Sequence, residues 1–272
     1  LTVYEGETVG LVGETGCGKS TFGRTILKLT EPTDGKIYLD GEDITGYSER
    51  KVRKYRQKMQ IVFQDPYSSL DPRETIGKSL EEVLQIQGRK QGCREKVLET
   101  LELVGLSSEV YDRYPHEFSG GQRQRVGIAR ALIMNPKLII ADECISALDV
   151  SIQAQVVNLM KDIQQETGTA YLFIAHDLSM VKYISDRIGV LHLGHLLETG
   201  TTEEIFENPI HPYTKSLLSA IPAPNPVVEK NRVALSYDYK TSGIDYNKGT
   251  DHLVSGTHYV KCTDEEFKKW TE

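Results

Sequence analysis

The sequence predicts an α/β protein whose core is a parallel sheet covered by helices, and three observations support this fold class. Short apolar runs alternate along the chain with segments whose apolar residues recur at helical spacing. Two of these runs, at 138–141 and 170–175, are apolar throughout, as strands buried beneath helices are. The chain has 272 residues, 39% of them hydrophobic, which suits one large domain with an appendage.

The first 65 residues predict the opening of the α/β core. Residues 9–12 form a short apolar run that stops at a glycine, and residues 20–29 place apolar side chains at helical spacing. We therefore expect a strand, a loop and a helix there. Residues 35–41 alternate like a strand that ends in a turn, and 59–63 predict a short strand leading to Gln64.

A helical insertion is expected next, because the pattern between 65 and 118 is helical, notably at 79–86 and 95–104. From Gly127 the α/β alternation returns. The expected elements, in order, are a helix through 131, a strand at 138–141, a helix at 151–166, a strand at 170–175, then a helix and short strands.

The last part of the chain differs in composition. After about Asn208 prolines punctuate the sequence, and a polar tail that contains tyrosines runs to Glu272. The prolines are Pro209, Pro212, Pro222, Pro224 and Pro226. We expect a linker and a small C-terminal appendage, and the residues leave open whether the tail carries any chemistry.

Composition argues against several classes of protein. The 32 Lys and Arg against 39 Asp and Glu give a net charge of −7, and no block of basic residues offers a face for nucleic acid. No apolar run approaches the roughly 20 residues that cross a bilayer. The four cysteines are scattered, which argues against disulfides or a zinc site and fits a reducing cytoplasm. The chain begins at Leu1 without a signal-peptide pattern, and we expect its start to be truncated.

One motif predicts a nucleotide site. The segment Gly13-Glu-Thr-Gly-Cys-Gly-Lys-Ser20 matches G-x-x-x-x-G-K-[ST] between a predicted strand and a predicted helix. Glycines let backbone N–H groups wrap phosphates, Lys19 adds a positive charge, and Ser20 offers a hydroxyl to Mg²⁺. The alternative is a tight turn without a ligand. The expected ATP-binding residues are Gly13, Glu14, Thr15, Gly16, Cys17, Gly18, Lys19, Ser20 and Thr21.

Polar residues follow three more predicted strands. Asp142 and Glu143 end the run at 138–141, Gln64 follows 59–63, and His176 follows 170–175. The carboxyl ends of parallel strands meet at one edge of a sheet, where ligands bind. Asp142 would face Mg²⁺ and Glu143 the attacking water. Each residue alone also has a structural explanation, and only their common placement favours one shared site.

Ser119-Gly-Gly-Gln-Arg-Gln-Arg125 has no role in a generic P-loop enzyme, and with it the chain resembles the ATPase subunits of ATP-binding-cassette (ABC) transporters. Six motifs stand in the family's order over about residues 1–225. They are the P-loop (13–21), Gln64 of the Q-loop, the signature motif (119–122), Walker B (138–143), the D-loop (146–149) and His176 of the switch.

The resemblance implies a RecA-like P-loop NTPase core with a parallel sheet, an N-terminal antiparallel β portion, an inserted α-helical subdomain and a small C-terminal extension. The implied segments are the first part of the ATP-binding core (1–65), the helical subdomain ending in the signature motif (66–125), the second part of the core (126–207), and a Pro-rich linker with the extension (208–272).

The resemblance also implies how the site works. Two ATPase subunits pack head to tail, so that the signature motif of one covers the ATP held by the other. The residues acting across that dimer would be Ser119, Gly120, Gly121, Gln122 and Asp149. Glu143, His176, Lys19 and Gln64 would serve hydrolysis, and Ser20, Gln64 and Asp142 would hold Mg²⁺.

Three finer patterns, at 113–125, 65–72 and 208–222, are similar to the ATPases of oligopeptide and dipeptide importers. This implies a second ATPase subunit that is a paralogue, two transmembrane permease subunits, an extracytoplasmic peptide-binding protein and a place on the cytoplasmic face of the membrane. The chain departs from the family at Cys144, where proline is usual. Some relatives bind an iron–sulfur cluster through C-terminal cysteines, but this chain has only Cys262 there, so we expect none.

Four alternatives remain at this stage. The importer could carry another solute such as nickel, or the chain could be a weakly hydrolysing partner in an ATPase heterodimer, which Cys144 would favour. A soluble ABC ATPase of DNA repair fits poorly, because the 55 or so residues between Gln64 and Ser119 show no sustained heptads. A P-loop kinase would not need residues 119–122.

Overall fold

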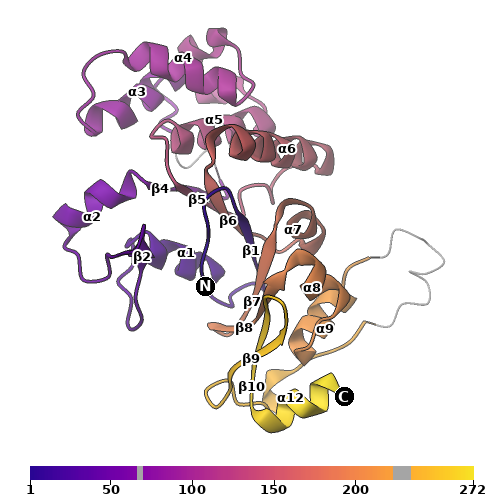
Figure 1. Ribbon diagram of the computed structural model, residues 1–272. Coiled ribbons are helices and arrows are strands. Elements are labelled where there is room, and N and C mark those ends of the chain that lie inside the picture. The colour runs from indigo at the N-terminus through magenta and orange to yellow at the C-terminus, as the bar shows by residue number, and fades with distance from the viewer. Residues whose placement is uncertain (66–69, 223–233) are drawn as a thin grey trace. The chain divides into compact units, whose positions relative to one another are not determined.

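The computed structural model describes residues 1–65, 70–222 and 234–272 (Figure 1). The chain divides into two units. The P-loop unit comprises Leu1, Thr8–Lys19 and Ile174–Glu272, and the signature unit comprises Thr2–Glu7 and Ser20–Phe173. Residues 66–69 of the pattern at 65–72, and Pro224 and Pro226 of the Pro-rich segment, lie outside the described residues.

Five strands among the described residues form the sheet of the P-loop unit. Their order across the sheet is β1 (Thr8–Val12), β7 (Arg187–His192), β8 (His195–Thr201), β10 (His258–Cys262) and β9 (Thr250–Ser255). β1 and β7 run parallel, with Val9 opposite Arg187, and the other neighbours are antiparallel. All five residues of β1 are buried, as expected of a strand covered on both faces.

Helices of the P-loop unit begin at residues suited to capping. They are α7 (Leu178–Ile184), α8 (Thr202–Glu207), α9 (Pro212–Ser219), α11 (Tyr239–Ser242) and α12 (Asp264–Thr271). Thr201 and Thr263 each form a reciprocal capping box with a glutamate three residues on. The tail that the sequence left open thus forms a hairpin and a helix, and β10 pairs with β8.

The signature unit holds the parallel strands β4 (Met59–Val62) and β5 (Leu138–Asp142), next to which lies β6 (Ala170–Ile174). A second, antiparallel sheet consists of β2 (Tyr38–Leu39) and β3 (Glu42–Asp43). The strand expected at 35–41 is therefore limited to two residues. Parallel strands, a small antiparallel sheet and inserted helices confirm the predicted α/β fold class.

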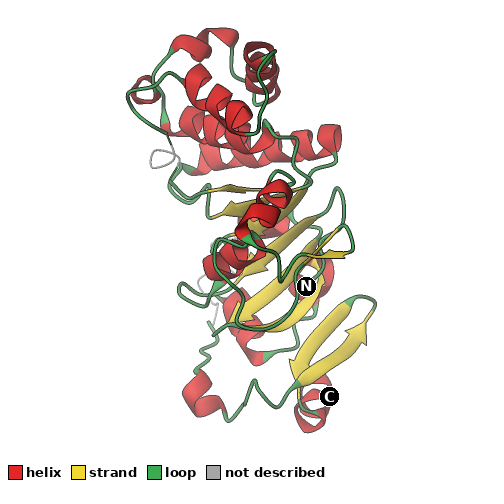
Figure 2. Ribbon diagram, turned by 90° about the vertical axis from the view of Figure 1, so that its left-hand side faces the viewer, coloured by secondary structure: helices red, strands yellow, loops and turns green. Residues whose placement is uncertain are grey.

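Most helices of the signature unit form one group, drawn in red at the top of Figure 2. It contains α3 (Ile76–Ile86), α4 (Cys93–Leu103), α5 (Gly120–Leu132), α6 (Val150–Thr167) and the 3₁₀ turns η2 (Ser108–Asp112) and η3 (Pro115–Glu117). α3 begins earlier than periodicity predicted, because the Thr75 side chain accepts the N–H of Lys78 and caps its first turn. Ile76, Leu80 and Leu101 are fully buried between these helices.

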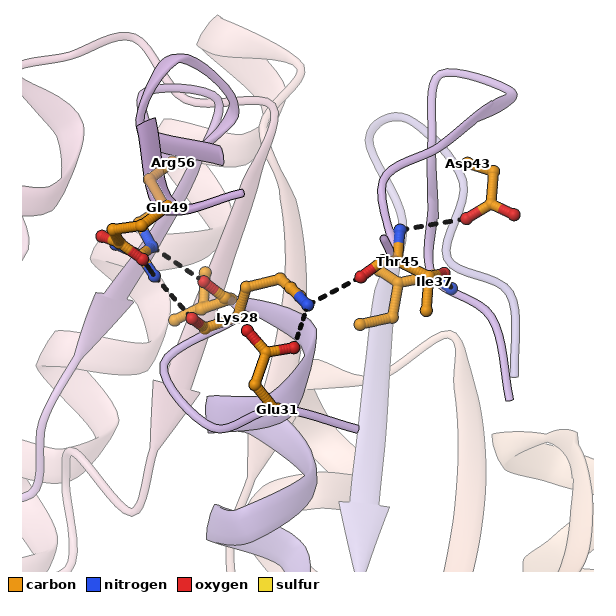
Figure 3. A network of polar contacts seen from close by, with 8 residues as sticks. Lys28, Glu31, Ile37, Asp43, Thr45, Glu49 and Arg56 are labelled. Carbon is orange, nitrogen blue, oxygen red and sulfur yellow. Dashed lines mark hydrogen bonds and ion pairs between the residues drawn. The ribbon is translucent and has the colours of Figure 1, made fainter. Parts of the chain in front are cut away.

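The helix that follows the P-loop, α1 (Lys19–Ile26), is anchored at its far end by a polar network (Figure 3). Lys28 is buried, has a φ of 54°, pairs with Glu31 and donates to the carbonyl oxygen of Thr45 at 2.7 Å. Arg56, from α2 (Glu49–Arg56), pairs with Glu49 and donates to the carbonyls of Leu27, at 3.0 Å, and Lys28. Arg56 thus satisfies two carbonyls left open after the last turn of α1 and fixes this end of the helix relative to α2, while Lys28 ties the same end to the backbone of Thr45.

Among the described residues, none of the helices combines the length and apolar character that crossing a bilayer requires.

Candidate nucleotide-binding site

The P-loop takes a backbone path that its glycines allow. Gly13, Gly16 and Gly18 have φ values of 152°, 83° and 110°, a region that residues with a Cβ rarely adopt. At Gly13 a Cβ would come within 2.1 Å of the carbonyl oxygen of Leu191, so only glycine fits between this turn and β7. Gly194 N–H donates to the carbonyl of Cys17 at 2.9 Å and holds the loop from the β7–β8 turn.

Lys19 begins α1 and is only 4% exposed. Its ammonium donates to the carbonyl oxygens of Gly13 at 2.7 Å and Glu14 at 3.0 Å. A phosphate oxygen is a stronger acceptor than these carbonyls, because its hydrogen bond to the ammonium joins two charged groups. The side chain is therefore held inside the loop, at the start of a helix whose first N–H groups also favour an anion.

Ser20 and Asp142 meet in the signature unit. The Ser20 hydroxyl donates to Oδ1 of Asp142 at 2.8 Å, and Asp142 is the last residue of β5 and 6% exposed. A hydroxyl and one carboxylate suit Mg²⁺, which takes oxygen ligands and keeps several of its waters. Within the described ranges no group of three or more His, Cys, Asp and Glu is placed to hold a metal.

Glu143 stands in a strained turn directly after β5, with a φ of 50°. Such left-handed conformations of a residue with a Cβ cost about 1 kcal/mol or more and cluster at functional sites. The Glu143 carbonyl accepts from the hydroxyl of Ser146 at 2.9 Å, and that hydroxyl accepts from the side-chain amide of Gln64 at 3.1 Å. The structure thus brings Gln64 to the turn that carries Glu143, through Ser146, the first residue of the D-loop segment 146–149.

Cys144, which replaces the usual proline, points into the interior and is 2% exposed. Burial raises the pKa of its thiol to about 12, so the group stays a neutral thiol near pH 7. Cys144 therefore acts as a small packing residue beside Glu143, without reactive thiolate chemistry.

The signature motif lies at the start of α5. The Ser119 hydroxyl accepts the N–H of Gln122 at 3.4 Å, and the Gln122 side chain accepts the N–H of Ser119 at 3.1 Å, which makes a capping box. Ser119, Gly120, Gln122 and Asp149 are all exposed. An exposed helix start is open to an anion brought by another molecule, which a role across a dimer requires.

The predicted residues thus fall into two sets. Gly13 to Lys19 and His176, which is exposed just after β6, belong to the P-loop unit, whereas Ser20, Gln64, Asp142, Glu143 and the signature motif belong to the signature unit. The peptide bond between Lys19 and Ser20 joins the two sets. Thr21 follows in α1 and is exposed.

One contact of the P-loop was not foreseen. The hydroxyl of Tyr213, in α9, accepts the backbone N–H of Glu14 at 2.9 Å. The sequence signal existed, because Tyr213 belongs to the His-Pro-Tyr run within 208–222, but spacing along the chain does not show a contact over 199 residues.

Two family models match this chain. The model described as "ABC transporter" matches residues 1–146, and the model described as "Oligopeptide/dipeptide transporter, C-terminal region" matches residues 197–239.

Curated relatives are similar along nearly the whole chain. The "Oligopeptide transport ATP-binding protein OppF" of Bacillus subtilis is 56% identical, over 99% of this chain and 90% of the relative. The "Dipeptide transport ATP-binding protein DppF" of Lactococcus lactis is 53% identical, over 98% of this chain and 86% of the relative.

Solved structures agree in fold. CbiO1 from Clostridium perfringens, part of an ABC transporter complex, aligns with a TM-score of 0.70 at 28% identity, over 76% of this chain and 82% of its own. The ATP-binding cassette MJ0796, a dimer bound to ADP and Pi, aligns with a TM-score of 0.66 at 32% identity, over 74% of this chain and 88% of its own. Since one family model covers more than half of the chain and relatives more than half identical span almost all of it, the chain belongs to the ABC transporter family, as one of its ATPase subunits.

Proposed function

We propose that this chain is the ATP-hydrolysing subunit of a membrane importer of oligopeptides or dipeptides. The observation that carries the proposal is the presence, in one chain, of the ABC transporter match at 1–146 and the oligopeptide/dipeptide transporter C-terminal match at 197–239. The relatives named for oligopeptide and dipeptide transport support the same substrate class. They do not favour nickel, DNA repair or a kinase.

The P-loop residues 13–21 would bind the phosphates of ATP, with Lys19 on the β- and γ-phosphates. The arrangement of Lys19 on the carbonyls of Gly13 and Glu14 supports this, because an ammonium already held inside the loop needs little movement to reach a bound phosphate. Ser20 and Asp142 would hold Mg²⁺, which supplies charge neutralisation on the phosphate oxygens; Gln64 would complete the set.

Glu143 would orient a water molecule and accept its proton as the water oxygen bonds to the γ-phosphorus. The bond from that phosphorus to the β–γ bridging oxygen breaks, and ADP and phosphate result. His176 would contact the γ-phosphate. The hydrogen bonds from Gln64 through Ser146 to the Glu143 turn support a role for Gln64 in linking the nucleotide to the rest of the transporter.

A second ATPase subunit, which we propose to be a paralogue, would complete the site. Its signature motif would cover the ATP held here, while Ser119, Gly120, Gly121, Gln122 and Asp149 of this chain would act on the partner's nucleotide. The exposed capping box at the start of α5 and the similarity to a dimeric ATP-binding cassette support this arrangement.

The permease subunits would dock on the signature unit, placing the chain on the cytoplasmic face of the membrane, opposite an extracytoplasmic peptide-binding protein. Beside Gln64 lies a groove with a volume of about 520 Å³, lined in part by Val62, Phe63, Val83 and Ile86. Ile86 is 55% exposed, so the groove offers apolar surface to a partner.

The test is affinity purification of the tagged, full-length protein from its native membranes in mild detergent, followed by identification of the co-purifying chains. Two permease subunits, a second ATPase and a peptide-binding lipoprotein are expected. Recovery of soluble DNA-repair or translation proteins alone would overturn the transport proposal. Ile86→Glu should lose the permeases and keep ATP binding by the isolated chain, whereas Leu253→Glu, at a side chain 54% exposed on β9, should keep both.

A further inference from the structure

We propose that Tyr213 is a positioning residue for the P-loop, through which the C-terminal region of the chain sets how tightly ATP is bound. The inference rests on the proposed function, because it assumes that the phosphates of ATP lie on residues 13–21. It goes beyond that function by giving the C-terminal region a part in nucleotide affinity.

The contact is made at the point where the loop leaves the sheet. The Tyr213 hydroxyl accepts the N–H of Glu14 at 2.9 Å, and Glu14 follows Gly13, whose backbone lies against the carbonyl of Leu191. The loop is therefore held from two directions, by β7 and by α9. Tyr213 is 1% exposed, so its ring is fixed within the fold and cannot turn to solvent.

A stacked histidine fixes the ring of Tyr213. The ring of His192, at the end of β7, lies 4.1 Å from the Tyr213 ring between centroids, at an interplanar angle of 25°. Nδ1 of His192 is hydrogen-bonded to the hydroxyl of Tyr246 at 2.7 Å, and that hydroxyl lies 2.9 Å from the hydroxyl of Tyr237. Burial raises the pKa of the Tyr213 phenol, which therefore stays neutral and accepts the Glu14 N–H through a lone pair of its hydroxyl oxygen.

A buried carboxylate fixes the backbone just before Tyr213. The two carboxylate oxygens of Glu198 on β8 accept the N–H groups of Ile210 at 2.7 Å and His211 at 3.0 Å. Nε2 of His258 on β10 lies 2.7 Å from the same carboxylate, and both of these side chains are fully buried. His211 Nδ1 in turn accepts the N–H of Tyr213 at 3.0 Å. The position of the Tyr213 hydroxyl is thus set by contacts from the strands β8 and β10 and from His211, the residue before α9.

The consequence concerns binding more than chemistry. Backbone N–H groups bind phosphate well only when the loop already has the right shape, so a loop that must be ordered on binding has a lower affinity. The Tyr213 hydroxyl bonds to the backbone of the loop that is proposed to bind the phosphates, so it should act on the ATP affinity and not on the hydrolytic step.

The experiment compares Tyr213→Phe with Tyr237→Phe in the full chain. Both variants remove one hydroxyl of the same aromatic cluster and keep the ring, but only Tyr213 bonds to the P-loop. We expect Tyr213→Phe to weaken ATP and ADP binding about three- to tenfold in calorimetric titration and to raise KM for ATP similarly, the range that one hydrogen bond supports. The kcat should stay within about twofold of the unaltered chain. Tyr237→Phe removes a hydroxyl that reaches the Tyr213 ring only through Tyr246 and His192, so it should change the ATP affinity by less than Tyr213→Phe does.

Equal ATP affinities of Tyr213→Phe, Tyr237→Phe and the unaltered chain would overturn the proposal. A fall in kcat at unchanged KM would also do so. The proposed function is tested separately in the same titration by Lys19→Ala, which should abolish ATP binding. If Lys19→Ala binds ATP normally, the proposal that residues 13–21 bind the phosphates is wrong, independently of the result for Tyr213→Phe.

A measurement on the unaltered chain covers the case in which Tyr213→Phe folds poorly. The Glu14 amide should exchange its hydrogen slowly in the nucleotide-free protein, because its acceptor is a buried side chain of the fold. Exchange of the Glu14 amide as fast as that of exposed Thr15 would contradict the proposal without any mutation.

Discussion

The P-loop and the signature motif differ in what holds them. The P-loop at 13–20 is fixed by residues far away along the chain, namely Leu191, Gly194 and Tyr213. The signature motif is fixed by its own neighbours, since Ser119 and Gln122 cap each other. The first arrangement makes a loop that is shaped before its ligand arrives, and the second leaves a helix start open to a partner. The difference fits a chain that binds one nucleotide itself and offers the second motif to another subunit.

The largest expected effect on ATP hydrolysis comes from a change in the P-loop. Lys19→Ala should lower ATP hydrolysis by at least about 100-fold, because a buried positive charge aimed at the phosphates is removed. Steady-state hydrolysis measures this, with Lys36→Ala as control, whose side chain is 66% exposed. Residual activity near that of the control would mean that the loop does not hold the transferred phosphate.

Glu143→Gln separates binding from chemistry. Hydrolysis should fall by about 100-fold or more, since the carboxylate that is proposed to accept the proton of the water is lost, while ATP binding should persist. Glu203→Gln, an exposed position in the first turn of α8, is the matched control. Hydrolysis at the rate of the unaltered chain would show that Glu143 has been given the wrong role.

Ser119→Ala tests the signature motif, the second of the two regions compared above. It removes a cap and one hydroxyl from the proposed site of the partner's phosphate, so hydrolysis by the assembled dimer should fall about tenfold. ATP affinity of the single chain should not change. Thr263→Ala removes the cap of α12 and should leave hydrolysis intact. An equal loss of ATP affinity in the isolated Ser119→Ala chain would remove the distinction between the two motifs.

The smallest expected effect is the pH dependence of the free energy of unfolding that arises from His211, the residue that caps the helix carrying Tyr213. Burial lowers the pKa of His211 from 6.5 to about 3, so between these values the unfolded chain binds a proton that the folded chain does not. The free energy of unfolding should therefore fall as the pH drops below 6.5, by up to about 2 kcal/mol at pH 5.

Denaturant unfolding at pH 7 and pH 5 measures this change. His211→Asn keeps an acceptor for the Tyr213 N–H but cannot titrate, so it should lose less stability between the two pH values. The same pH dependence in both proteins would place the titrating group elsewhere.

Local sequence patterns predicted much of the fold. Glycines, a lysine and a hydroxyl at fixed spacing predicted the loop and the start of α1. Strand ends at Gln64 and Asp142 were likewise foreseen, because the apolar runs before them stop there. The division into four segments, and the roles of the individual site residues, stay predictions.

Contacts between residues far apart in the chain could not be predicted from the sequence. Nothing in the spacing of Glu14 and Tyr213 brings them together, and the buried Glu198–His258 pair joins residues 60 positions apart in the sequence. The early start of α3 was missed for a different reason. Apolar periodicity finds the buried face of a helix, whereas its first residue is set by the hydroxyl of Thr75.

The pairing of β10 with β8 also bears on how the protein avoids self-association. Without the hairpin of β9 and β10, β8 would expose unpaired N–H and C=O groups along one side, and strands of other molecules could pair with them. With the hairpin in place, the outermost strand is β9, which is six residues long and carries Asp251 and His252. The C-terminal tail thus pairs with β8 and leaves β9 as the outer strand, whose charged Asp251 disfavours pairing with strands of other molecules.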